Sequence, residues 1–229
     1  MAKVAVLHTS FVFVTVEPVI TDLISELIPG AELLHFVDSD VLATVVREQG
    51  ISERSELRMV HLAQAAEAAG ADVIFSACSS LGPTLDAAQR AVGVPVVKID
   101  QAMATIAARS DRIGVLATVP TTLGPTSDLI ASVAAGSGRS PHIVQRLCPG
   151  AFDVLMAGDR VAHDQMIADQ AAELAGEVDV IVLAQASMNR LVERLEAETG
   201  LPVLSSPRSG VENLARIVRE VSHHGSPMN

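Results

Sequence analysis

Two short segments carry side chains that could move a proton or bind an anion. The first is Ser76–Ser80 (Ser-Ala-Cys-Ser-Ser), in which a thiol and two hydroxyls follow a hydrophobic run. A thiol titrates near pH ~8.5, so Cys78 can act as a base, an acid or a nucleophile once its thiolate is stabilised. Ser79 and Ser80, with the backbone N–H groups of the turn, can hold an anionic oxygen. The alternative is a buried structural cysteine, because free cysteine is among the most buried residue types.

The second segment is related to the first by an internal repeat. The stretch Ala71–Ser80 is echoed by Val178–Ser187, and the spacing between the two copies is constant. Asp72 and Asp179 lie 107 positions apart, as do Pro95 and Pro202. Chance alternation of Val and Ile would not keep both spacings, so the repeat indicates two similar halves.

The repeat pairs Cys78 with Gln185 and Ser80 with Ser187. An amide has no useful proton-transfer pKa, so a symmetric reaction with two thiols cannot run through this pair. Gln185, flanked by Ala186 and Ser187, is expected instead to donate hydrogen bonds to a carboxylate or a developing enediolate.

Further polar residues follow the strands that open each half. His8, Thr9 and Ser10 end the first strand, and Thr118, Thr121 and Thr122 surround Pro120 in the matching position. The threonines form either an ordinary helix cap or a carboxylate clamp, and we favour the clamp. His8 is either a cleft-facing proton donor or carboxylate ligand, or a structural histidine.

Two other residues have competing interpretations, whereas the second cysteine and three methionines have one each. His163 either substitutes for the missing second acid or belongs to the acidic beginning of a helix, which is the commoner case. Lys98 either is solvated at the sheet rim or supplies charge for a second carboxylate or phosphate. Cys148, before Pro149-Gly150, is predicted to be a structural core residue, and Met103, Met156 and Met166 to fill the core.

The elements that must position these residues alternate between two kinds. Short runs rich in β-branched residues predict strands at Val4–His8, Leu33–Val37, Val73–Phe75, Val94–Ile99, Ile113–Ala117, Ile143–Leu147, Val180–Leu183 and Pro202–Leu204. Ala- and Leu-rich stretches predict helices at Ser55–Ala69, Thr84–Val92, Ser127–Ala135, His163–Ala175, Leu191–Glu198 and Val211–Val221. This alternation predicts an α/β fold with parallel sheets and a site at the carboxyl ends of the strands. We expect a first half at 1–110, whose last helix could pack on the other lobe, a second half at 111–221, and a flexible tail at 222–229.

Composition excludes several classes of protein. The 229 residues include 49% hydrophobic side chains, carry a net charge of −11 and contain no Trp or Tyr. A hydrophobic content this high predicts a packed globular chain. An acidic chain with few aromatic side chains is a poor partner for nucleic acid. Two cysteines and no paired-His spacing indicate neither a disulfide framework nor a metal site. The apolar start has no basic flank or cleavage site and no other stretch is long enough to span a bilayer, so we expect no membrane segment and a cytoplasmic location.

Taken with the repeat, the strand-end motifs resemble the aspartate/glutamate/hydantoin racemase superfamily, which also holds arylmalonate decarboxylase and maleate cis-trans isomerase. Ser76–Ser80 is similar to the first-half cysteine loop, Leu183–Met188 to the second-half loop, and Leu116–Thr122 to the threonine-rich carboxylate loop. The resemblance implies two pseudo-twofold-related α/β halves with the site in the cleft between them. It also implies proton transfer by two cysteines without a cofactor, from which Gln185 departs.

We therefore expect a cofactor-independent, racemase-like isomerase that acts at the carbon α to the carboxylate of a small acid, with Cys78 as the reactive group. A decarboxylase or lyase with one thiol, and a cis-trans isomerase that forms a thioether adduct, remain alternatives within the same fold. A small-carboxylate-binding protein that has lost catalysis is the alternative from another class. Dimers are common in the superfamily, so a homodimer or higher homo-oligomer stays open.

Overall fold

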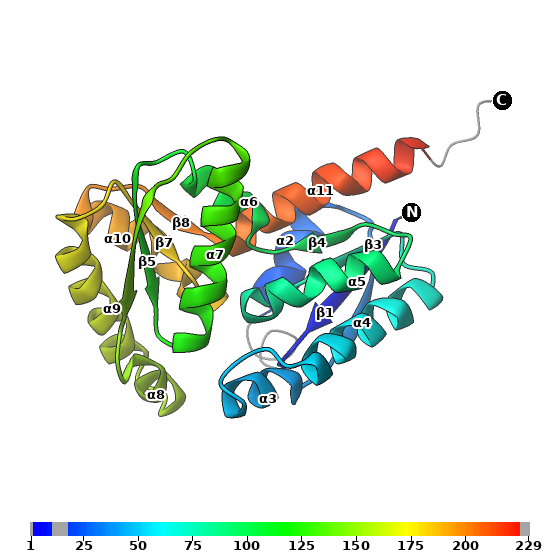
Figure 1. Cartoon of the computed structure of the whole chain (residues 1–229), viewed down its shortest axis with the longest axis horizontal. Coiled ribbons are helices and arrows are strands. Elements are labelled where there is room, and N and C mark those ends of the chain that lie inside the picture. Colours follow the sequence, from blue (N-terminus) through cyan, green and yellow to red (C-terminus); the bar gives the residue numbers. More distant parts are fainter. Residues whose placement is uncertain (1, 11–17, 225–229) are drawn as a thin grey trace. The chain divides into compact units, whose positions relative to one another are not determined.

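The computed structural model describes residues 2–10 and 18–224. The chain divides into two compact units, of which unit 1 comprises Met1–Ile99 with Pro207–Asn229 and unit 2 comprises Asp100–Ser206. Each unit contains one four-stranded parallel sheet (Figure 1). The predicted fold class, α/β with a parallel sheet and flanking helices in each half, is confirmed.

Unit 1 is built on the strand order β2-β1-β3-β4. Its strands are β1 (Lys3–His8), β2 (Glu32–Val37), β3 (Val73–Ser76) and β4 (Val96–Lys98). Its helices are α2 (Val19–Leu27), α3 (Val41–Arg47), α4 (Glu53–Ala68), the 3₁₀ helix η1 (Ser79–Thr84), α5 (Leu85–Ala91) and α11 (Ser206–His224), whose first residue belongs to unit 2.

The sheet of unit 1 is buried on both faces, which is why its strands read as hydrophobic runs. Leu7 and Ile74 pack on one face with α3, α4 and α5. Val6 and Phe75 pack on the other face with α2 and α11. Because side chains alternate along a strand, neighbouring residues of β1 and β3 serve different cores.

Unit 2 has the same strand order, β6-β5-β7-β8. Its strands are β5 (Arg112–Ala117), β6 (His142–Leu147), β7 (Val180–Leu183) and β8 (Val203–Ser205). Its helices are α6 (Gln101–Ala107), α7 (Pro120–Gly136), α8 (Ala151–Met156), α9 (Arg160–Ala175), the 3₁₀ helix η2 (Ala186–Leu191) and α10 (Val192–Thr199). Leu116 and Leu183 face α8, α9 and α10, whereas Val115 and Val182 face α6 and α7.

Equivalent hydrogen bonds hold the first residue of β1 in unit 1 and the first residue of β5 in unit 2. The backbone N–H of Lys3 donates to the Asp72 carboxylate at 2.8 Å. The backbone N–H of Arg112 donates to the Asp179 carboxylate at 3.0 Å. The two aspartates that mark the sequence repeat therefore have the same structural task.

Several predicted elements differ from the observed ones. The expected strand Val94–Ile99 is reduced to β4, at Val96–Lys98. The helix expected at Ser127–Ala135 begins earlier, at Pro120. Pro125 lies in its second turn, where it removes one backbone hydrogen bond but does not end the helix. Four shorter helices, α2, α3, α6 and α8, were not predicted.

The structure also corrects the expected boundaries. The first unit ends at Ile99, so the last helix of the expected first half, α6, belongs to the second unit, as the prediction allowed. The chain returns to the first unit at Pro207 instead of remaining in the second half to 221. The reason is that Val211, Leu214 and Val218 complete a core of the first sheet. Helix α11 continues to His224, so the tail expected at 222–229 is helical at its start, and its last five positions lie outside the described residues.

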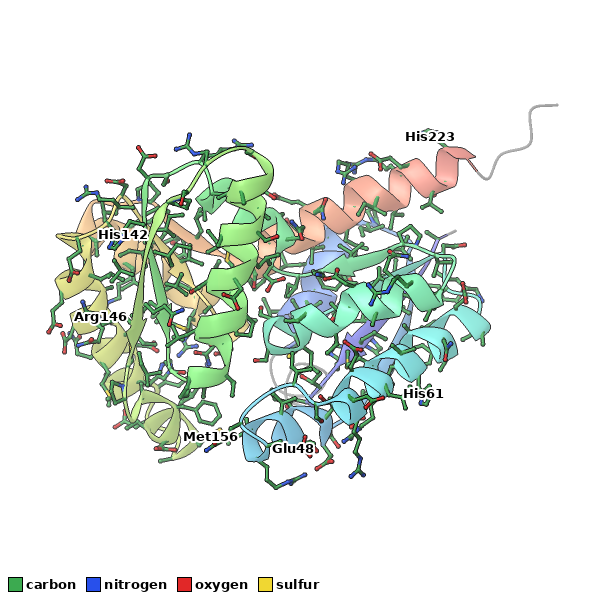
Figure 2. The ribbon with its side chains drawn as sticks, viewed as in Figure 1. Glu48, His61, His142, Arg146, Met156 and His223 are labelled. Atoms are coloured by element: carbon green, nitrogen blue, oxygen red, sulfur yellow. The ribbon has the colours of Figure 1, made fainter. Side chains whose placement is uncertain are left out.

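Two further observations concern the surface. Met156, predicted to fill the core, is 68% exposed at the end of α8, and Figure 2 shows its side chain at the surface. Within residues 2–10 and 18–224, none of the helices combines the length and hydrophobicity that crossing a membrane requires.

Candidate functional site

Cys78 lies directly beyond the carboxyl end of β3 in unit 1, where it is the N-cap residue of η1. It is half-buried and packs against the core beneath α4 and α5. The helix predicted to start at Thr84 starts one residue later, at Leu85. Between Cys78 and this α-helix lies the 3₁₀ helix η1, which contains Pro83. The N-terminus of the α-helix is therefore separated from the thiol by η1, and the helix dipole falls off over that distance.

The hydroxyls expected beside the thiol lie on the same edge of the sheet. Ser79 is half-buried and Ser80 is buried, both in η1. Thr9, directly beyond β1, is buried, and Ser10 is half-buried. Because all four strands are parallel, the carboxyl ends of β1 and β3 meet at this edge.

His8 belongs to the other face of the sheet. It alternates with Val4 and Val6, which pack beneath α2 and α11, whereas Cys78 packs on the α4 side. The His8 ring is 1% exposed, and its Nε2 lies 3.0 Å from His35 Nδ1. Burial, with the neighbouring His35, lowers the pKa of His8 to about 4. His8 is therefore neutral near pH 7, which favours the structural alternative over a cationic carboxylate ligand.

Lys98 ends β4 on the α4 side of the sheet, next to Ser76 in register. Its ammonium group lies 2.8 Å from the Asp86 carboxylate in α5, and its side chain is 16% exposed. The lysine is therefore neither freely solvated nor an unpaired charge.

Gln185 is the N-cap residue of η2, directly beyond β7 in unit 2. Its Oε1 accepts a hydrogen bond from the backbone N–H of Thr118 at 2.6 Å and one from the Thr118 hydroxyl at 3.0 Å. A backbone N–H can only donate, so the atom that it reaches must be the amide oxygen. The Gln185 Nε2 group, with two N–H donors, is thereby directed away from Thr118 and is available to an acceptor.

The other predicted residues of unit 2 lie at the starts of α7 and η2. Thr121 and Thr122 lie in the first turn of α7, and the Thr122 hydroxyl donates to the Val119 carbonyl at 3.0 Å. Thr122 therefore makes a local helix-start contact, while Thr118 contacts Gln185. Ala186 and Ser187 are half-buried in the first turn of η2.

His163 lies in the first turns of α9, which begins where Asp159 accepts a capping hydrogen bond from the Ala162 N–H at 2.9 Å. Its ring is fully buried, and Nδ1 lies 2.7 Å from Asp164 Oδ1. Asp164 also binds Arg190 of η2, at 2.5 Å. Burial alone would raise the pKa of Asp164, but the hydrogen bonds from His163 and Arg190 outweigh it and lower the pKa.

Arg190 was missed by sequence reasoning, because an arginine three residues after Ser187 carries no pattern that separates it from a surface charge. Its contact with Asp164 depends on how α9 and η2 pack. Arg58 was missed for the same reason. Its Nε donates to Asp38, just beyond the end of β2, at 2.6 Å.

Cys148 lies in a different environment from Cys78. Its side chain is 1% exposed within the core beneath α8 and α9, and burial raises the pKa of its thiol to about 11. These properties suit the structural role that was predicted for it. Among the described residues, no cluster of three His, Cys, Asp or Glu side chains could hold a metal ion.

Known proteins share this fold. A structure of glutamate racemase from Francisella tularensis with D-glutamate superposes with a TM-score of 0.73 at 12% identity, over 100% of this chain and 85% of that one. Allantoin racemase from Klebsiella pneumoniae gives 0.64 at 18% identity, over 100% and 91%. Unliganded arylmalonate decarboxylase gives 0.57 at 16% identity, over 95% and 93%.

Sequence comparison reaches the family rather than an individual relative. No curated protein matches the chain. The family model described as Asp/Glu/Hydantoin racemase matches residues 14–214. Because that match covers most of the 229 residues, the chain belongs to the Asp/Glu/Hydantoin racemase family.

Proposed function

We propose that this protein is a racemase-like isomerase that works without a cofactor on the carbon α to the carboxylate of a small acid. Cys78 is the group that moves the proton, and Gln185 is a group that holds an anionic oxygen. The observation that carries the proposal is the fixed orientation of the Gln185 amide, whose oxygen is engaged by Thr118. The two N–H donors of the amide then point away from Thr118, and the sequence repeat pairs this residue with Cys78.

The chemistry follows from these two groups. The Cys78 thiolate takes the proton from the α-carbon, and the electrons of the broken C–H bond delocalise into the carboxylate as an enediolate. Hydrogen bonds from the Gln185 amide and from the hydroxyls of Ser79 and Ser80 stabilise its oxygens. The thiol then returns the proton to carbon. Return from the same face gives exchange with retained handedness, and inversion needs a second proton donor.

A one-thiol decarboxylase is the second candidate function, and the amide in place of a second thiol favours it. In that reaction the bond between the α-carbon and one carboxylate breaks, carbon dioxide leaves, and the electron pair forms the enediolate. The Cys78 thiol then gives its proton to the α-carbon from one face. One acid is sufficient for this reaction, whereas symmetric racemisation needs two.

An exchange assay in deuterated water tests both candidates. The enzyme is incubated with a panel of amino, hydroxy and malonic acids, and deuterium at the α-carbon, optical purity and carbon dioxide are measured. Deuterium with loss of optical purity identifies racemisation, deuterium with retained handedness identifies one-thiol exchange, and carbon dioxide release identifies decarboxylation. Cys78→Ala should lower the active rate by about 10²- to 10⁴-fold.

Cys148→Ala is the matched control, because it removes the buried thiol and should leave the rate unchanged. A non-catalytic carboxylate-binding protein is distinguished by the same samples. It would show no turnover on any acid, and iodoacetamide would label Cys78 slowly, with an ordinary thiol pKa. Activity that survives Cys78→Ala would refute the proposal.

A further inference from the structure

A charged cluster beside the turn that carries Gln185 has no part in the proposed proton transfer. The Arg190 guanidinium donates from Nη2 to Asp164 Oδ1 at 2.5 Å and from Nε to Oδ2 at 3.4 Å. Its Nη1 donates to the backbone carbonyl of Ser187. One planar side chain therefore joins the first turns of α9 to the backbone of η2.

This contact acts on the backbone next to the amide. Ser187 is two residues after Gln185, in the first turn of the 3₁₀ helix that Gln185 caps. A guanidinium bound to a carboxylate and a carbonyl at once has little freedom to reorient, because its donors form a rigid fork. The side chains of Arg190 and Asp164 are only 30% and 21% exposed, so the ion pair is partly shielded from solvent.

His163 contacts the same oxygen of the Asp164 carboxylate, Oδ1, as Arg190 does. The Arg190 Nη2 donor lies 3.2 Å from His163 Nδ1, but the shorter contact of Nδ1, at 2.7 Å, is to Asp164 Oδ1. The Asp164 carboxylate accepts only, so the proton of the histidine is assigned to Nδ1. The Nε2 atom of His163 is buried, and no side chain or backbone group in the described part of the chain pairs with it. An unpaired buried polar atom costs folding free energy, and a well-packed apolar residue at this position would avoid that cost.

We propose that Arg190 is a positioning residue for Gln185, and that Asp164 and His163 hold Arg190 in place. Asp164 binds Arg190, and Arg190 donates to the Ser187 carbonyl. Ser187 lies two residues after Gln185, whose side-chain oxygen accepts from Thr118. That Gln185 is positioned to hold an anionic oxygen rests on the proposed function. The positioning itself is independent of any substrate.

The readout is the side-chain amide signal of Gln185 in nitrogen-15 NMR spectra of the full chain, assigned by its disappearance in Gln185→Leu. Arg190→Lys keeps the positive charge and removes the fork, so it should shift and broaden this signal. It should also raise the Kd for malonate, used as the carboxylate probe, at least fivefold. The unfolding midpoint in urea should change no more than in the control. Lysine that restored a wild-type signal would show that charge alone suffices and would overturn the inference.

Arg194→Lys is the matched control. Arg194 also ties its helix, α10, to α9, through a hydrogen bond to Gln165 Oε1 at 2.8 Å, and it pairs with Glu198 at 2.7 Å. It makes none of the contacts to η2 that Arg190 makes. If Arg194→Lys moves the Gln185 signal as much as Arg190→Lys does, the positioning role is wrong.

A second pair of variants separates positioning from proton transfer. His163→Asn places an amide N–H where Nδ1 was and removes Nε2, so a positioning role leaves the Gln185 signal and the exchange rate near wild type. His163→Leu removes both and should move the signal. Loss of exchange in His163→Asn with an unchanged Gln185 signal would assign His163 to proton transfer instead, against the inference. If malonate leaves the wild-type Gln185 signal unmoved, the proposed carboxylate role fails, while the effect of Arg190→Lys on that signal still decides the positioning role.

Discussion

At the scale of single residues, Gln185 can take the place of a thiol only in a different role, because a side-chain amide forms hydrogen bonds but does not exchange protons as a thiol does. The oxygen of Gln185 is taken by two donors of Thr118, at 2.6 and 3.0 Å. The nitrogen can donate but cannot take up a proton at ordinary pH. Gln185, which the sequence repeat pairs with Cys78, is therefore suited to holding a negative charge and unsuited to exchanging a proton.

Gln185→Glu tests this role with almost no change in shape. Glutamate keeps one oxygen as the acceptor for Thr118 and replaces the two N–H donors with a negatively charged oxygen. We expect the Kd for malonate, measured by calorimetric titration, to rise at least about tenfold, which is ~1.4 kcal/mol. Gln165→Glu, on the exposed side of α9, adds the same charge elsewhere and should leave the Kd unchanged. Equal affinity in Gln185→Glu and wild type would rule out the donor role.

His8 makes the stability of the protein depend on pH. Its pKa is lowered from 6.5 to about 4 by burial and by His35, so the unfolded chain binds a proton at a pH where the folded chain does not. The stabilising effect of the neutral ring is therefore complete above about pH 6.5 and is lost as pH falls toward 4, by up to ~3 kcal/mol. Urea unfolding between pH 7.5 and 4.5 measures this loss.

His8→Gln should flatten that pH dependence, because glutamine does not titrate. His61→Gln, at an exposed position of α4 (Figure 2), should keep the wild-type slope. If the two variants show the same slope, His8 is not the group responsible.

At the scale of elements, the packing of α11 depends on the absence of a side chain at Gly210. A Cβ atom at this position would lie 2.3 Å from the backbone oxygen of Ile99, at the end of β4. Backbone cannot move aside as a flexible side chain can. Gly210 therefore allows the close approach by which α11 covers one face of the sheet of unit 1.

Gly210→Ala should lower the free energy of unfolding by about 3 kcal/mol, because the helix must move away from the sheet to relieve the clash. Gly136→Ala is the matched control. It is also within a helix, α7, and its Cβ would meet nothing within 4 Å. There alanine should stabilise by up to about 1 kcal/mol through its better helix propensity. Urea unfolding of both variants compares the two effects, and a neutral Gly210→Ala would contradict this account of the packing.

At the scale of the whole molecule, unit 1 is discontinuous in sequence. Its sheet comes from the first 99 residues, but Val211, Leu214 and Val218 of α11 are buried in one of its two cores. Unit 2 is a continuous stretch, Asp100–Ser206, with both faces of its sheet covered by its own helices. The two units therefore differ in what they need from the rest of the chain.

Two fragments check this division. A fragment of residues 100–206 should unfold cooperatively in urea and show dispersed NMR signals, because its cores are complete. A fragment of residues 1–110, cut at the boundary that the sequence suggested, lacks α11 and should be largely unfolded or aggregated. Adding a separate peptide of residues 206–224 should restore its structure in part. A cooperative, fully folded 1–110 fragment would refute the division.

Features that are local or periodic could be predicted from the order of the amino acids alone. Runs such as Val4–His8 and Val180–Leu183 are hydrophobic because parallel strands are buried on both faces, and this pattern predicted the fold class. The repeat around Cys78 and Gln185 placed both residues at strand ends without any knowledge of packing. Backbone geometry and burial act over a few residues, so they leave a readable pattern.

Contacts between residues that are distant in sequence became known from the three-dimensional packing. The face of the sheet on which His8 lies, the ion pair between Lys98 and Asp86, and the contact of Arg190 with Asp164 all depend on how separate elements pack. The return of α11 to the first unit depends on a core that spans more than a hundred residues of sequence. Such contacts leave no local pattern, because the residue types involved are common on any protein surface and their energy comes from partners that the neighbouring sequence does not specify.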